Sequence, residues 1–99
     1  MRVILSGPVT ADHLADAELM AGIVPTIFVT NGLSHPPRGS RLPVEVMEPC
    51  MKQPAETRIR AREYSMVQNA DALICADYNP GLVSLARHYD LLVYEVSDE

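Results

Sequence analysis

The stretch from Ala70 to Tyr89, ADALICADYNPGLVSLARHY, sets the pattern for the whole chain. It opens with the continuous apolar run Ala72–Ala76, which is typical of a β-strand covered on both faces. Asn79 then offers a helix N-cap, and Pro80 suits the first helical turn. Apolar residues follow at helical spacing: Leu82, Leu85, Ala86 and Tyr89. The stretch therefore predicts a buried strand that leads directly into an amphipathic helix.

The rest of the chain repeats this alternation. Four other short apolar runs are predicted as strands: Val3–Leu5, Thr26–Thr30, Val44–Met47 and Leu91–Val96. Two further helices are predicted over Thr10–Ala21, capped by Thr10 and stopped by Gly22, and over Ala55–Asn69. Alternating strands and helices favour right-handed crossovers and a mainly parallel sheet. We therefore predict one α/β domain over residues 1–99, with three layers, five strands and about three helices.

One connection departs from the alternation. Residues 31–43, NGLSHPPRGSRLP, contain three prolines and two glycines, which disfavour a helix. We expect a loop here in place of a helix. A loop of this length in a compact domain is usually functional, mobile or part of an interface.

Charge narrows the class of partner. The chain carries a net charge of −5, which argues against a nucleic-acid groove, since such grooves need surplus Lys and Arg. The segment from Arg38 to Arg62 is nevertheless +3, so the remainder is −8. A local basic segment on an acidic protein favours a small anionic ligand. The alternative is a solvated helix face, with Glu56–Arg60 as an i,i+4 ion pair.

Other features bear on location, metals and assembly. No apolar run approaches the roughly 20 residues that span a bilayer, and the apolar start is too brief for a secretory signal. Cys50 and Cys75 lack metal-ligand spacing, and we expect a buried free thiol at Cys75, with a Cys50–Cys75 disulfide as the alternative. We expect a cytoplasmic protein without metal or cofactor. A chain this small buries a limited share of its surface, so we also expect a homodimer.

Ligands of open α/β sheets bind beyond the carboxyl ends of the strands, and three segments of this chain are predicted to meet there. The first is Ser6-Gly7-Pro8, where Gly7 lets backbone amides approach a phosphate before a helix begins. The second is Thr30-Asn31-Gly32, in which Asn-Gly supplies two backbone amides and a side-chain amide. Each of these segments is equally consistent with an ordinary turn.

The third segment, Asp77-Tyr78-Asn79-Pro80-Gly81, follows the fourth predicted strand. Asp77 is suited to accept hydrogen bonds from a ribose, and Tyr78 is suited to stack on a base. Asn79 and Gly81 contribute amides at a helix N-terminus, although Asn-Pro-Gly is also simply a good helix start. The convergence of three such segments predicts a ligand pocket.

Basic and titratable residues also lie in segments near the predicted pocket. Arg38, in the loop over residues 33–42, is a candidate phosphate contact. His35 is the one histidine placed near this edge, while His13 and His88 fall on predicted helices and are expected at the surface. A histidine without a nearby carboxylate is weak evidence for acid–base catalysis. We assign no catalytic residue from the sequence.

The residue blocks resemble a known family. RVILSG, PTIFVTNG, LPVEVMEP, REYSMVQNADALICAD and LVSLARHYDLLVYEV follow the order found in SLOG-type Rossmann-like nucleotide-binding proteins, in particular the small bacterial and phage-borne branch related to YspA and YpsA. Arg62 and Met66 match that branch's helix, and Ala70–Ile74 and Leu85-Ala86 match its later motifs. Nucleoside 2-deoxyribosyltransferases share a similar layout. The resemblance implies a Rossmann-like fold and a nucleotide-type ligand, with Arg62 as a second candidate phosphate contact.

The chain also departs from that family. The helix after the family's second glycine loop is replaced by residues 33–42, and its Gly-Thr phosphate motif is reduced to Asn79-Pro80-Gly81. SLOG phosphoribohydrolases and the deoxyribosyltransferases carry a glutamate in the helix after the fourth strand. That glutamate has no counterpart here, because Val83, Ser84 and Leu85 stand in its place. Cleavage of an N-glycosidic bond thus lacks its nucleophile or base. The resemblance implies a nucleotide-binding or nucleotide-sensing protein rather than an enzyme. A glycosidase-like or deoxyribosyltransferase-like enzyme and a protein-interaction module with a degenerate pocket remain the alternatives.

Overall fold

The computed structural model describes residues 1–32, 34–47 and 54–96, apart from the side chains of residues 55, 56 and 59. Five parallel strands form one sheet: β1 (Arg2–Ser6), β2 (Ile27–Thr30), β3 (Val44–Val46), β4 (Ala72–Cys75) and β5 (Leu92–Glu95). Three helices connect them: α1 (Ala11–Ala21), α2 (Ala55–Gln68) and α3 (Pro80–His88). The predicted α/β class, parallel sheet and three helices are confirmed. The predicted ends of the strands and helices differ from the observed ends by no more than one residue.

The strand order is β3-β2-β1-β4-β5. The chain moves outward from β1 to β3, then returns to place β4 on the other side of β1. The order therefore reverses between β1 and β4, at the centre of the sheet. Sheets of this kind bind ligands beside such a reversal, at the carboxyl ends of the strands.

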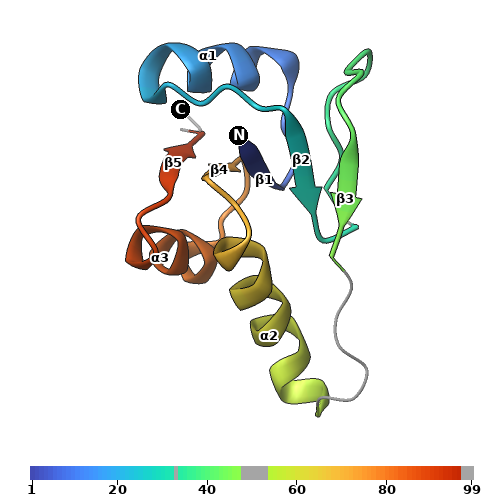
Figure 1. The fold of residues 1–99 in the computed structure, drawn as a ribbon, viewed down its shortest axis with the longest axis vertical. Helices are drawn as coiled ribbons and strands as arrows, with labels where there is room; N and C mark the ends of the chain where they lie inside the picture. Colours follow the sequence, from blue (N-terminus) through green and yellow to red (C-terminus); the bar gives the residue numbers. More distant parts are fainter. Residues whose placement is uncertain (33, 48–53, 97–99) are drawn as a thin grey trace.

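The helices form two outer layers. Helix α1 covers one face of the sheet, where it packs over β4 and β5, and α2 and α3 lie on the opposite face (Figure 1). The α1 face has a core that includes Phe28 and Ile23, and the α2–α3 face has one that includes Val29 and Met66. These two cores make the domain a three-layer, Rossmann-like sandwich.

Local signals explain where the helices begin and end. The Thr10 hydroxyl accepts from the His13 N–H, and Nδ1 of His13 accepts from the Thr10 N–H, which together form a capping box. Gly22 ends α1 in the left-handed conformation, at φ 67°. His13 lies half-buried at the surface, where this reciprocal pairing holds its ring against the helix start, and His88 is exposed, as expected.

The third helix follows its prediction closely. The Asn79 side chain accepts from the Leu82 N–H and Pro80 starts the helix. Leu82 and Ala86 are buried, while Tyr89 meets Tyr64 of α2 edge-to-face, with ring centroids 6.4 Å apart. This aromatic contact ties α3 to α2 at the surface.

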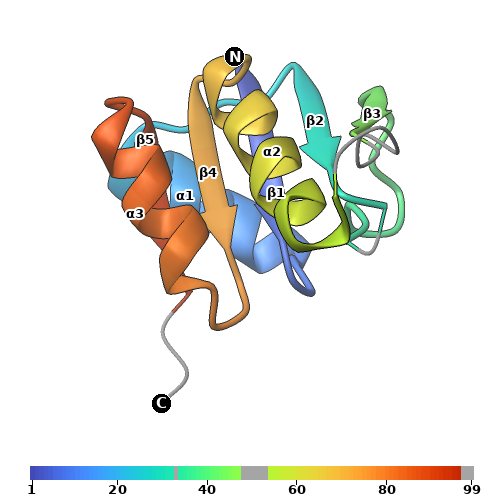
Figure 2. The same cartoon turned by 90° about the horizontal axis from the view of Figure 1, so that it is seen from below.

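Helix α2 packs on the sheet through its carboxyl-terminal half. Met66 and Val67 are buried, whereas the side chain of Ile59 lies outside the described residues. Figures 1 and 2 show the helix inclined, with its amino-terminal half pointing away from the strands. The side chain of Glu56 also lies outside the described residues, so the predicted Glu56–Arg60 pair is not described.

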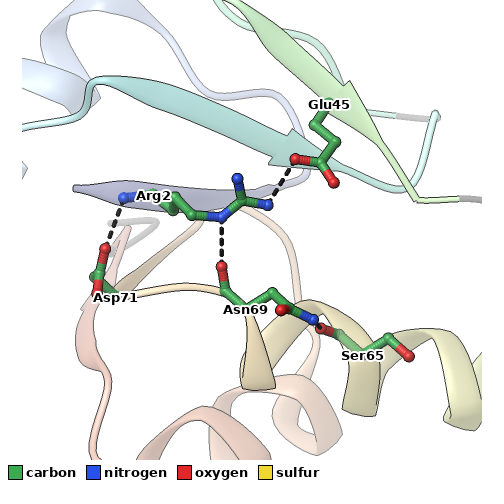
Figure 3. A network of polar contacts seen from close by, with 5 residues as sticks. All are labelled: Arg2, Glu45, Ser65, Asn69 and Asp71. Carbon is green, nitrogen blue, oxygen red and sulfur yellow. Dashed lines mark hydrogen bonds and ion pairs between the residues drawn. The ribbon is translucent and has the colours of Figure 1, made fainter.

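Arg2 joins three separate segments at the amino ends of the strands (Figure 3). Its Nε donates to the Asn69 carbonyl at 2.5 Å and its Nη2 pairs with Glu45 of β3 at 2.6 Å. Its backbone N–H donates to Asp71 at 2.8 Å. The guanidinium thus ties the edge strand β3 to the end of α2.

Replacing Arg2 by methionine is therefore expected to lower the free energy of unfolding by about 1 kcal/mol, since two charge-assisted contacts are lost but both side chains are partly exposed. Urea unfolding followed by circular dichroism measures this loss. The matched control is Arg87→Met, which removes the more exposed ion pair with Glu95 and should cost at most about 0.5 kcal/mol. Equal losses in the two variants would contradict the bridging role of Arg2.

The loop over residues 31–43 contains no helix in its described part, as predicted. It leaves β2 at the carboxyl end of the sheet and returns to the amino end, where the Pro43 carbonyl accepts from the Phe28 N–H at 3.0 Å. None of the described helices is long and apolar enough to cross a membrane.

Candidate functional site

The carboxyl ends of β1 and β4 meet at the point where the strand order reverses. We call the cluster formed there by Ser6, Gly7, Ser34, Cys75 and Asp77 the rim cluster. Ser6 and Cys75 end paired strands in register with each other. Asp77 follows β4, and the loop after β2 brings in Ser34. The topology thus gathers segments from three strands at one edge of the sheet.

Asp77 is the charged centre of this cluster. The Ser6 hydroxyl donates to its Oδ1 at 2.7 Å, and the Cys75 thiol donates to the same oxygen at 3.3 Å. The thiol also lies 3.1 Å from the Asp77 carbonyl. Two donors on one carboxylate oxygen fix the direction of the side chain. Within the described residues, Oδ2 receives no hydrogen bond, so it remains able to accept one.

Cys75 is a free thiol and only 2% exposed, which confirms the predicted buried thiol. Cys50, its alternative partner, lies outside the described residues. Burial raises the pKa of the Cys75 thiol, and the Asp77 carboxylate that accepts its proton raises it further. The thiol therefore stays protonated near neutral pH, where it acts as a hydrogen-bond donor and not as a nucleophile.

Gly7 is held in the left-handed region at φ 81°. A Cβ at this position would lie 2.7 Å from the Asp77 Cβ and 2.8 Å from the Asp77 nitrogen. From the sequence, we expect Gly7 to let backbone amides approach a phosphate. The structure adds a second reason for a glycine, which is the close approach of the β1 and β4 turns to each other.

Two of the backbone donors predicted to cradle an anion are already paired in this structure. The Gly7 N–H donates to the Ser34 hydroxyl at 2.9 Å, and the Gly32 N–H donates to the Thr30 hydroxyl at 3.2 Å. At the start of α3, the Leu82 N–H donates to the Asn79 side chain. No pocket is found in the part of the chain that the structure describes. Within the described residues, the rim cluster and the neighbouring Tyr78 therefore form an open surface and not a cavity, and we call this surface the rim shelf.

Three further predicted ligand contacts lie at the carboxyl edge of the sheet: Tyr78, Asn31 and Gly81. Tyr78 adjoins Asp77 and is 92% exposed, so its ring is available for stacking. Asn31 is half-buried at the end of β2, where its side chain accepts from the Ser34 N–H at 3.2 Å. Gly81 is exposed in the first turn of α3. These three residues share the carboxyl edge of the sheet with the cluster.

The structure places the two arginines of the predicted site on different elements. Arg38 is exposed and belongs to the turn of the 31–43 loop, which Figure 1 draws beyond the amino end of β3. Arg62 is half-buried on α2, and among the described residues its Nε is a buried polar atom without a hydrogen-bond partner. Next to it, burial raises the pKa of Glu63, against the lowering effect of Arg62 and Arg60. The structure does not bring Arg38 to the rim.

Two members of the cluster were missed from sequence. Ser34 follows Asn31 at the spacing of a turn in which an Asn side chain accepts a later backbone N–H, which is a detectable signal. The pairing of Cys75 with Asp77 has no sequence signal beyond proximity. His35, the histidine weighed for catalysis, is exposed in the loop. No group of three potential metal ligands occurs among the described residues.

Comparison with known proteins yields no significant match to a family model, a curated protein or a solved structure. The resemblance to SLOG-type proteins therefore rests on the residue blocks quoted above. The anionic ligand, the homodimer and the cytoplasmic location likewise stay predictions.

Proposed function

We propose that this protein binds a small nucleotide or nucleotide derivative on the rim shelf and does not cleave it. The observation that carries this proposal is the Asp77 carboxylate, which is fixed through one oxygen by Ser6 and Cys75 and whose other oxygen accepts no hydrogen bond from the described residues. A carboxylate prepared in this way suits the hydroxyl groups of a ribose, because it accepts without having to be ordered first.

The neighbours of Asp77 supply the rest of the recognition. The exposed Tyr78 ring offers a stacking surface for a base. The Gly7 amide directly follows β1, beside the reversal of strand order, and it is the position for a phosphate oxygen once Ser34 has left it. Arg62, whose Nε lacks a partner among the described residues, is a second candidate phosphate contact.

The chemistry of the shelf favours binding over cleavage. The nucleophilic side chains beside Asp77 are the Ser6 hydroxyl and the Cys75 thiol, which are buried and donate their protons to the carboxylate. The raised pKa of the thiol keeps it protonated. Asp77 accepts both protons, but Ser6 is only 4% exposed and Cys75 only 2%, so neither nucleophile is open to a glycosidic carbon of a ligand on the surface.

Asp77→Asn tests the proposal directly. The amide keeps the shape of the side chain but loses the charge and one acceptor, so affinity for nucleosides and nucleotides is expected to fall about tenfold or more. Isothermal titration with adenosine, cytidine and their 5′-monophosphates measures this loss. A thermal shift by these ligands in the unmodified protein is the first screen.

The control is Asp16→Asn, which makes the same chemical change on the exposed surface of α1, where affinity should not change. Binding that survives Asp77→Asn at full strength would remove the shelf as the site. The same incubations, analysed by chromatography, test catalysis, and release of free base would overturn the non-catalytic part of the proposal.

A further inference from the structure

The Ser34 hydroxyl occupies the amide that the proposed phosphate subsite needs. We infer that Ser34 is a built-in competitor for the phosphate group of the ligand, so that a phosphorylated ligand binds only when Ser34 leaves Gly7. This inference rests on the proposed function, since it concerns the same shelf. It adds a residue that sets the preference between phosphorylated and unphosphorylated ligands.

The contact that carries the inference is short and shielded from solvent. The Gly7 N–H donates to the Ser34 hydroxyl oxygen at 2.9 Å, and Ser34 is only 6% exposed. Ser34 lies 27 positions from Gly7 in the chain, so the 31–43 loop reaches over the rim to make the bond. The hydroxyl oxygen thus sits where an oxygen of a bound anion would accept from this amide.

The chemistry of the two acceptors differs. A serine hydroxyl is a neutral acceptor, whereas a phosphate oxygen carries charge and forms a stronger hydrogen bond with a backbone N–H. A phosphorylated ligand can therefore displace Ser34, but part of its binding free energy is spent on breaking the existing bond. A nucleoside that engages only Asp77 and Tyr78 does not meet this cost.

The attachment of Ser34 to the fold is compatible with such a displacement. Its N–H donates to the side chain of Asn31, three residues earlier, in a bond that is local to the loop. Ser34 belongs to no strand or helix. Its movement away from Gly7 therefore requires no break in the hydrogen bonding of the sheet.

The decisive variant is Ser34→Ala, which removes the competing hydroxyl. Its affinity for adenosine 5′-monophosphate is expected to rise about fivefold, because the Gly7 amide no longer has to be vacated. Its affinity for adenosine should stay within about twofold, since that ligand leaves the Gly7 amide alone. Isothermal titration of both ligands against both proteins measures the difference.

A second readout does not depend on ligand binding. The Gly7 amide should exchange with solvent faster in Ser34→Ala than in the unmodified protein, as measured by nuclear magnetic resonance on labelled protein. The same spectra show whether the variant is folded. Ser40→Ala is the matched control, because it removes a hydroxyl from the same loop and should alter neither the affinities nor the Gly7 exchange rate.

The outcomes separate the two proposals. Adenosine 5′-monophosphate that binds the unmodified protein but binds Ser34→Ala equally well or more weakly would overturn the competitor role and leave the proposed function standing. Failure of both ligands to bind either protein would overturn the proposed function, and the inference with it. A selective gain for the monophosphate supports both.

Discussion

Alanine at position 7 is expected to destabilise the protein by about 3 kcal/mol or more, the largest effect of any exposed or half-buried site we consider. Two costs add at this position. The residue sits at φ 81°, which an L side chain adopts only with strain, and the new Cβ would lie 2.7 Å from the Asp77 Cβ and 2.8 Å from its nitrogen. The β1 and β4 turns would have to separate, and the rim cluster with them. Urea unfolding followed by circular dichroism gives the loss.

A matched glycine isolates the contribution of the contact. Gly39 has φ 88°, but a Cβ there would meet nothing within 4 Å. Gly39→Ala therefore carries the conformational strain alone and should cost about 1 kcal/mol. If the two variants lose the same stability, the close approach of Gly7 to Asp77 is not a constraint on the fold. If Gly7→Ala is folded, it should also bind the proposed ligand more weakly, because Asp77 is displaced.

Truncation of Phe28 to alanine is expected to cost about 3–5 kcal/mol, the range for a large side chain removed from a tight core. Phe28 is the one phenylalanine of the chain and is fully buried on the α1 face of the sheet, in a cluster with Val3, Leu5, Ile23 and Ile74. Among the described residues, α1 is the one helix on this face, and the described part of the connection from β2 to β3 contains no helix. The cavity therefore has few neighbours that can collapse into it.

The shift of the urea midpoint measures this loss, which is a large part of the 5–15 kcal/mol that stabilises an ordinary domain. Leu19→Ala is the control. Leu19 is a large apolar residue on α1, but it is 85% exposed, so its truncation should change stability by no more than about 0.5 kcal/mol. A loss below about 1.5 kcal/mol for Phe28→Ala would mean that the loop and α1 repack freely around the gap.

Much of the fold was predictable because it depends on local chemistry. The run Ala72–Cys75 is apolar throughout, which suits only a strand that is covered on both faces. Asn79 and Pro80 set the start of α3 through the geometry of a single turn. The prolines of the 31–43 loop exclude a helix wherever the loop happens to pack. Such signals need no knowledge of distant residues.

The candidate site was predictable only in its location. Strand–helix alternation places the segments after β1, β2 and β4 at one edge of the sheet, and Gly7 and Asp77 are found there. The sequence did not indicate how the donors at that edge are paired. The Gly7 amide was expected to face a ligand, yet it donates to Ser34, 27 positions away. A hydrogen bond of this kind depends on the path of a loop, which local patterns do not encode.

By itself, the sequence determined the class of fold, the order of strands and helices along the chain and the caps of two helices. These features depend on periodicity and on turn chemistry within a few residues. The tertiary structure alone decided the order of strands in the sheet, the anchoring of Arg2 between β3 and α2, and the fixing of Asp77 by Ser6 and Cys75. Each of these features joins residues that are far apart in the chain. Such residues meet only when the whole core packs, so no local pattern in the sequence indicates their contact.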